Sequence, residues 1–100
     1  MADDVQSSTA ERTARDKAAL IEQLRKTPVI QIACEKAGVS RMTFYRWRKD
    51  DSAFAEAADE ALTEGKSLVN DLAESQLLSA LKSGDPWSIQ YWLRHHHAEY

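Results

Sequence analysis

Apolar residues recur every three or four positions along most of this chain, which is the spacing of one face of an α-helix. No stretch shows the sustained two-residue alternation of a half-buried strand. Proline and glycine separate the periodic segments, and only Gly65 lies inside one. The pattern therefore predicts an all-α protein.

Residues 11–26 predict a first helix, because small and apolar residues recur there at helical spacing (Ala14, Ala18, Leu20, Ile21 and Leu24). Residues 1–10 are polar and terminal, and we expect a disordered tail there. Thr27 and Pro28 then predict the start of a second helix, as its N-cap and its first residue. We expect this helix to reach about Lys36 and to bury Ile30 or Ile32 together with Ala33 and Ala37.

A tight turn is expected at Gly38, because glycine readily adopts the positive φ that such a turn needs. Val39 would fill the turn with an apolar side chain, and Ser40 would cap a third helix over residues 41–49. Residues 11–50 thus predict a three-helix unit that contains a helix-turn-helix.

The third helix is basic on the side opposite its expected buried residues, Phe44 and Trp47. In a helix-turn-helix the second helix lies in the DNA major groove, where cations attract phosphates and side chains reach base edges. We therefore expect double-stranded DNA as a partner, and the expected contacts are Ser40, Arg41, Thr43, Tyr45, Arg46, Arg48 and Lys49. The plainer alternative is a helical hairpin with a solvated basic face.

Residues 53–83 contain no proline and predict one long helix with two apolar faces. The first face is expected to join copies of the chain, through Phe54, Ala58, Ala61, Leu62, Gly65, Leu68, Val69 and Leu72. Leu77, Leu78 and Leu81 lie on nearly the opposite face, so the helix either bends near residues 73–76 or has different neighbours at its two ends.

The segment Gly84-Asp85-Pro86 ends the long helix and starts a last one over residues 86–97. This helix is expected to fold back onto the three leucines as a helical hairpin. Residues 51–100 are therefore the expected oligomerisation region.

Charge is distributed unevenly, although the formal net charge is only −3. Residues 11–49 contain ten Lys and Arg against four Asp and Glu, whereas residues 50–100 contain three against ten. The basic half suits a polyanion, and the acidic half needs a different partner.

No pattern indicates catalysis, a cofactor or a metal site. The consecutive residues His95, His96 and His97 point about 100° apart on a helix, so they cannot close around one ion. Cys34 is the only cysteine, which excludes an internal disulfide, and we expect it to be buried. No apolar run could span a membrane, and the first ten residues do not have the order of a secretion signal. We therefore expect a non-enzymatic, cytoplasmic protein with no membrane partner.

The run from Cys34 to Arg48, CEKAGVSRMTFYRWR, resembles the helix-turn-helix of phage DNA-packaging proteins of the small terminase subunit type. It is also similar to helix-turn-helix units of transposases and one-domain repressors. The closing run over residues 87–97, WSIQYWLRHHH, resembles the ending of short small-terminase-like proteins. The resemblance covers about residues 20–97.

This resemblance implies a ring-shaped homo-oligomer that recognises viral genomic DNA for packaging, in the cytoplasm of a bacterial host. It also implies a protein partner, the large terminase subunit with its ATPase and nuclease activities. Larger members of the family bind that subunit through a further C-terminal segment, so the resemblance does not assign the surface of this chain that would bind the large subunit.

Two other functions fit the same residues. One is a small dimeric repressor that reads a palindrome, and the number of copies per particle would distinguish it from a ring. The other is an adaptor that binds protein through its acidic half, and it would not bind DNA at low ionic strength. A compact monomer, in which the last helix covers the apolar faces, is the alternative to any oligomer.

Overall fold

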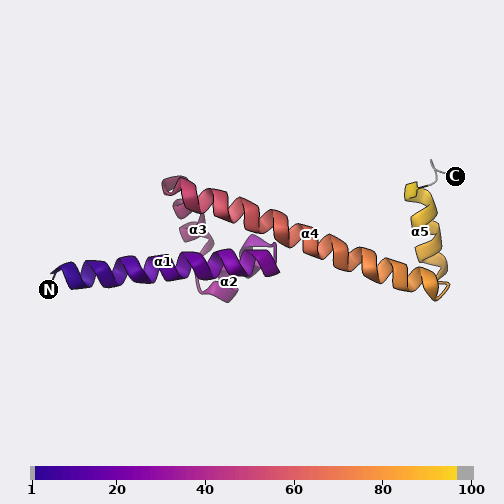
Figure 1. Ribbon diagram of the computed structural model, residues 1–100, viewed down its shortest axis with the longest axis horizontal. Coiled ribbons are helices and arrows are strands. Elements are labelled where there is room, and N and C mark those ends of the chain that lie inside the picture. Colours follow the sequence, from indigo (N-terminus) through magenta and orange to yellow (C-terminus); the bar gives the residue numbers. More distant parts are fainter. Residues whose placement is uncertain (1, 97–100) are drawn as a thin grey trace. The chain divides into compact units, whose positions relative to one another are not determined.

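The computed structural model describes residues 2–96, with side chains from Thr9 onward, and its elements are all helices (Figure 1). In this range they are α1 (Ala2–Lys26), α2 (Ile30–Ala37), α3 (Arg41–Asp50), α4 (Ser52–Lys82) and α5 (Pro86–His96). The predicted all-α class is confirmed. Over the same range, no helix combines the length and the apolar character that crossing a membrane would require. The chain divides into two compact units, unit 1 (Met1–Ser67) and unit 2 (Leu68–Tyr100).

Helix α1 begins at Ala2, well ahead of the predicted start at Glu11, so residues 2–10 are helical where a disordered tail was expected. The sequence contains no proline or glycine before Pro28 that would stop a helix from extending. Adding residues to an existing helix needs no new nucleation. The last predicted helix is α5 as far as His96, and its predicted final residue, His97, lies outside the described residues.

Helix α2 begins at Ile30, and the predicted start at Pro28 was wrong. Val29 occupies the N-cap with an extended backbone and no side-chain cap, and its N–H donates to the Thr27 carbonyl at 2.8 Å. A residue before proline is biased toward extended backbone, so the segment from Thr27 to Val29 links the helices. Ala33 and Cys34 are buried, Ile30 and Ala37 pack against the core, and Ile32 is exposed.

The turn between α2 and α3 has the predicted chemistry. Gly38 has φ +73°, its N–H donates to the Glu35 carbonyl at 3.2 Å, and the Val39 N–H donates to the Cys34 carbonyl at 2.9 Å. These two bonds end α2 in a Schellman motif. The Ser40 hydroxyl then accepts the Thr43 N–H at 3.1 Å, which confirms Ser40 as the cap of α3.

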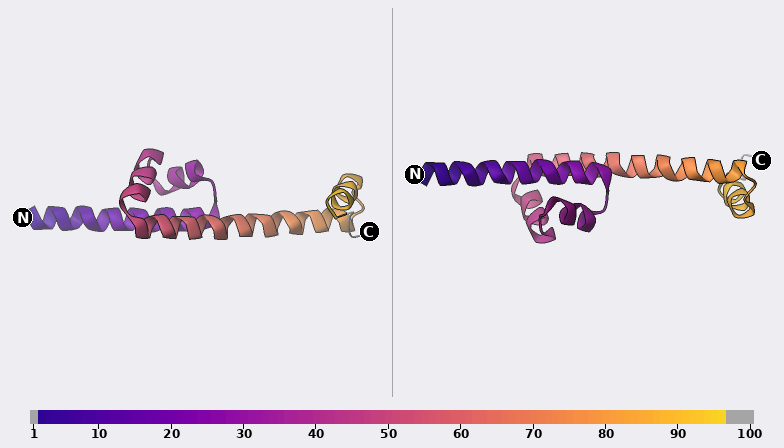
Figure 2. Two further views of the ribbon diagram at one scale, coloured as in Figure 1. Left: turned by 90° about the horizontal axis from the view of Figure 1, so that it is seen from above. Right: turned by 90° about the horizontal axis from the view of Figure 1, so that it is seen from below.

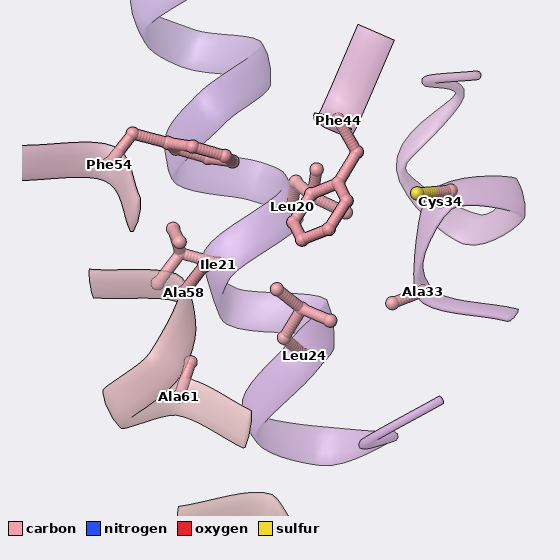
Figure 3. Close-up of a cluster of buried hydrophobic side chains, with 9 residues drawn as sticks. All are labelled: Leu20, Ile21, Leu24, Ala33, Cys34, Phe44, Phe54, Ala58 and Ala61. Carbon is pink, nitrogen blue, oxygen red and sulfur yellow. The ribbon is translucent and has the colours of Figure 1, made fainter. Parts of the chain in front are cut away.

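Unit 1 has one apolar core, to which all four of its helices contribute (Figure 3). Helices α2 and α3 lie on the same side of α1 and the adjoining part of α4 (Figure 2). The core consists of Leu20, Ile21, Leu24, Ala33, Cys34, Phe44, Phe54, Ala58 and Ala61. Val39 and Trp47 pack against it, as predicted.

Helix α4 crosses α1 closely at Gly65, where a Cβ would lie 2.6 Å from the carbonyl oxygen of Leu24. Part of the predicted assembly face is therefore occupied by contacts within unit 1. Its first members are already buried within unit 1 (Phe54, Ala58, Ala61 and Gly65), and Leu62 packs against the same core. Leu68, Val69 and Leu72 remain exposed. Helical periodicity identified one apolar face correctly, but α1 of the same chain covers its first part.

Unit 2 contains the rest of α4 and, after a turn at Gly84 (φ +80°), α5. Asp85 caps α5 as predicted, because its carboxylate accepts the Ser88 N–H at 2.8 Å and the Ser88 hydroxyl at 2.7 Å. These bonds hold the pKa of Asp85 below its ordinary value. Helix α5 nevertheless leaves the end of α4 at a steep angle (Figure 1), so the predicted hairpin does not form.

An open hollow of about 720 Å³ lies in the angle between α5 and the second half of α4. Its walls include Leu77 and Leu78 from α4 and Trp87, Tyr91 and Trp92 from α5. The rings of α5 stack on one another at four-residue spacing, such as Trp92 on His96 with centroids 3.9 Å apart. Helix α4 is uninterrupted, and its two halves have different neighbours, which was one of the two predicted possibilities.

Candidate nucleic-acid interface

Two aromatic residues fix the orientation of α3. The Phe44 side chain is fully buried, and its ring meets that of Phe54 edge-on with centroids 5.8 Å apart. Trp47 is half-buried, and its ring lies 5.6 Å from the same Phe54 ring. Both face inward as predicted, so the opposite side of α3 faces solvent.

The outer face of α3 is cationic. Five exposed residues at three- and four-residue spacing form it: Arg41, Met42, Tyr45, Arg46 and Lys49. The Arg41 guanidinium lies 5.8 Å from the centroid of the Tyr45 ring, within cation–π range. No acidic residue lies between Arg41 and Lys49 in the sequence. Four of the seven predicted DNA contacts therefore share this face.

Met42 is absent from the predicted contacts, yet it is 82% exposed and lies in the middle of this face. Its spacing of three, four and seven residues to Tyr45, Arg46 and Lys49 is the signal that places it there. An apolar side chain in this position can contact the methyl group of thymine in the major groove.

Ser40 and Thr43 lie at the start of α3, and their hydroxyl groups bond to each other. The Ser40 hydroxyl donates to Thr43 Oγ1 at 2.8 Å and accepts the Thr43 N–H. Both side chains are thus engaged in the cap, and the structure gives them a role in fixing the start of α3.

Arg48 turns toward α4. Its guanidinium forms a two-point ion pair with Asp59, in which the Nη2–Oδ2 distance is 3.2 Å. This bond raises the pKa of Arg48 and lowers the pKa of Asp59. The structure therefore separates Arg48 from the outer face, although the sequence grouped it with the DNA contacts.

A second ion pair lies just after the same end of α3, at its C-cap residue Asp51. Lys17 Nζ lies 2.9 Å from Asp51 Oδ2, and Asp51 Oδ1 accepts the Phe54 N–H at 3.1 Å, which caps α4. The Lys17 ammonium also lies 5.6 Å from the centroid of the Trp47 ring. The bond from Lys17, followed by that from Phe54, holds the pKa of Asp51 below its ordinary value.

Cys34 lies in the core, 1% exposed, and burial raises the pKa of its thiol. Among the side chains that the structure describes, no three from histidine, cysteine or carboxylate residues gather where they could hold a metal ion.

No family model, curated protein or solved structure matches this chain.

Proposed function

We propose that α2, the turn at Gly38 and α3 form a helix-turn-helix that binds double-stranded DNA through the outer face of α3. The observation that carries this proposal is the orientation of α3. Because Phe44 and Trp47 face inward, the cations of the helix project away from the core. A cationic helix with exposed side chains suits the major groove, where both phosphates and base edges are within reach.

The positions of these side chains suggest their roles. Arg41 and Tyr45 lie in the first turns of α3, the part that reaches the floor of the groove in helix-turn-helix proteins. Arg46 is exposed, and its guanidinium can contact a guanine edge or a phosphate with two hydrogen bonds. Lys49 lies at the far end, where a point charge suits a phosphate.

We further propose that this chain is a non-catalytic multimer that marks viral DNA for packaging, as the resemblance to small terminase subunits implies. One helix-turn-helix neutralises few phosphates, and each contact adds a slope of about −0.9 to the salt dependence of binding. Several linked copies restore affinity by raising the effective concentration. In this role the chain would regulate a large subunit that carries ATPase and nuclease activities.

Substitution of Arg46 tests DNA binding. We expect the full chain to bind a generic duplex of about 25 base pairs at low salt, with a steep loss of affinity as salt rises. Arg46→Ala should weaken binding roughly tenfold and reduce the salt slope by about 1. The matched control is Arg12→Ala, which removes an exposed arginine from α1, and its affinity should change less than twofold.

Fluorescence anisotropy across a salt series measures these quantities, and native mass spectrometry of the same samples reports assembly. Arg46→Ala should leave the oligomer intact. Absence of binding at low salt would exclude the DNA role and favour the adaptor. Equal affinity of Arg46→Ala and the wild type for the duplex would exclude the outer face of α3 as the DNA-binding surface. Particles with exactly two copies would favour the repressor over the packaging protein.

A further inference from the structure

Unit 2 does not bury its own apolar side chains. Among residues 68–96 the only buried residue is Ser88. Eight large apolar residues are between 38% and 66% exposed: Leu68, Val69, Leu72, Leu78, Trp87, Ile89, Tyr91 and Leu93.

Six of these eight residues form two separate surfaces of unit 2, because residues on α4 recur at about 100° per position. The first is the hollow beside α5, to which α4 contributes Leu77 and Leu78; we call it the groove. The second is formed by Leu68, Val69 and Leu72 on nearly the opposite side of α4; we call it the ridge. Serine and glutamine continue the ridge toward the end of α4 (Ser75, Gln76 and Ser79), and the two small serine side chains allow another helix to approach closely.

The charges of unit 2 indicate what kind of partner these surfaces suit. Only five charged residues occur between Leu68 and His96: Asp71, Glu74, Lys82, Asp85 and Arg94. The groove contains the carboxylate of Glu74 and no lysine or arginine, so it does not suit a nucleic acid or an anionic lipid surface. Depletion of charge around exposed aromatic side chains is typical of the core of a protein–protein interface.

We infer that the groove of one chain holds the ridge of a second copy of the same chain. Every copy carries both surfaces, so association of identical chains covers both at once, whereas a foreign protein in the groove would leave the ridge exposed. The residues of the ridge are uncharged, and Asp71 lies at its border, next to Leu68 and Ser75. The uncharged ridge can approach the Glu74 carboxylate in the groove. Its serine and glutamine side chains can donate hydrogen bonds to that carboxylate.

The arrangement of the two surfaces determines the symmetry of the assembly. Groove and ridge lie on opposite sides of α4, so a contact between them joins unlike surfaces. After one contact, the first copy still has a free ridge and the second copy a free groove. Such a heterologous contact continues from copy to copy, and it produces a closed ring or a filament and not a two-fold dimer. This inference rests on the multimeric part of the proposed function and does not depend on DNA binding.

Two substitutions of matched exposure test the inference on the full chain. Leu72→Glu places a charge on the ridge, and Leu78→Glu places one in the groove; these leucines are 58% and 48% exposed. Val29→Glu is the control, because Val29 is 49% exposed and lies in unit 1. We expect sedimentation velocity at about 50 μM to show more than two copies for the wild type and the control, and monomers for each of the other two variants.

Mixing the two monomeric variants is the decisive step. Leu72→Glu keeps an intact groove and Leu78→Glu an intact ridge, so an equimolar mixture should form dimers and stop there. A monomeric wild type, or variants that still assemble alone, would overturn the inference. A mixture that stays monomeric would exclude the pairing of groove with ridge. Circular dichroism confirms that each variant is helical, and anisotropy with DNA on the same samples shows separately whether the proposed function holds.

Discussion

At the scale of single residues, Gly65 determines how closely two helices of unit 1 can approach. It lies in the middle of α4, where glycine costs about 1 kcal/mol of helix stability relative to alanine. The nearest atoms to a Cβ at this position would be the carbonyl oxygens of Leu24 and Arg25, at 2.6 and 2.9 Å. Both belong to the backbone of α1, so neither can rotate away.

Gly65→Ala should therefore destabilise unit 1 even though alanine favours the helix. Forcing an extra carbon into a packed contact costs roughly 1–3 kcal/mol, and we expect a net loss of about 1–2 kcal/mol after the gain in helix propensity. Urea unfolding followed by circular dichroism measures the change. The control, Ser67→Ala, is exposed two residues later and should change stability by less than about 0.5 kcal/mol. An unchanged or higher stability for Gly65→Ala would show that α4 does not cross α1 at this point.

Asp51 should make the stability of unit 1 depend on pH. Its pKa is lowered in the folded protein, chiefly by Lys17, so the folded state keeps this carboxylate charged at lower pH than the unfolded chain does. The resulting stabilisation is complete above the unfolded pKa of about 3.9, and it is lost as pH falls through the lower folded value.

Asp51→Asn should remove this pH-dependent contribution, while asparagine still caps α4. The wild type should be more stable than the variant near pH 7, and the difference should shrink below about pH 4. Urea titrations between pH 7 and pH 3 measure it. Asp50→Asn removes the same charge one residue earlier and serves as the control. Parallel pH profiles for the wild type and Asp51→Asn would contradict the role of the Lys17 pair.

Residues whose partners are near in sequence were predictable, and those with distant partners were not. Gly38, Ser40 and Asp85 were predicted correctly because their turn or cap bonds reach at most five residues along the chain. Gly65 was assigned to a surface between copies, because its partner is a carbonyl of α1 that no local pattern reveals. The same reason applies to Arg48, whose ion pair with Asp59 spans eleven positions.

At the scale of elements, the pair formed by Arg48 and Asp59 joins α3 to α4. Because Asp59 pairs with Arg48, one cation of α3, the helix that we propose enters the DNA major groove, is less available to phosphates. The Asp59 carboxylate also adds a negative charge nearby. The pair therefore holds α3 in place and limits its attraction for phosphates.

Asp59→Asn should strengthen DNA binding by a factor of a few at low salt, because it releases Arg48 and removes a negative charge. The gain should disappear at high salt, where screening shortens the range of both effects. Anisotropy with the same duplex measures the affinities. Asp71→Asn, which removes an exposed carboxylate from the part of α4 in unit 2, should have little effect. Weaker binding by Asp59→Asn would indicate that the pair orients α3 for DNA.

Helical periodicity was sufficient to predict which segments are helices, but not how they pack. It gave α3 and α4 nearly their observed bounds, because apolar spacing and caps agreed. It missed the start of α2, where Thr27 and Pro28 looked like a cap and a first turn but belong to the linker before the helix. The hairpin of α4 and α5 failed for another reason. A turn with the right cap does not fix the angle between two helices, and the rings of α5 stack within α5.

At the scale of the whole molecule, the two units bury very different amounts of apolar surface. Unit 1 contains the entire buried apolar core among the described residues, whereas the apolar side chains of unit 2 are exposed or half-buried. Local stability follows buried contacts, so the two units should open at different rates.

Hydrogen exchange should show this difference in a monomeric sample. In Leu72→Glu, amides of residues 17–26 and 33–47 should exchange slowly, and those of residues 86–96 should exchange within seconds. In the assembled wild type, protection should rise in residues 68–96 and stay unchanged in unit 1. Mass spectrometry at two protein concentrations provides the comparison. Equal protection of α5 in both samples would mean that this helix is stable without a second copy.

The buried thiol of Cys34 has a consequence for how opening of unit 1 can be followed. The chain has a single cysteine, and it is enclosed in the core. A thiol reagent can therefore reach it only in molecules whose α2 has moved away from α1, and the labelling rate reports how often that happens, with one adduct per molecule. An adduct on this buried thiol should hinder α2 from packing back onto the core, so exposure to an oxidant or alkylating agent should steadily deplete the folded population.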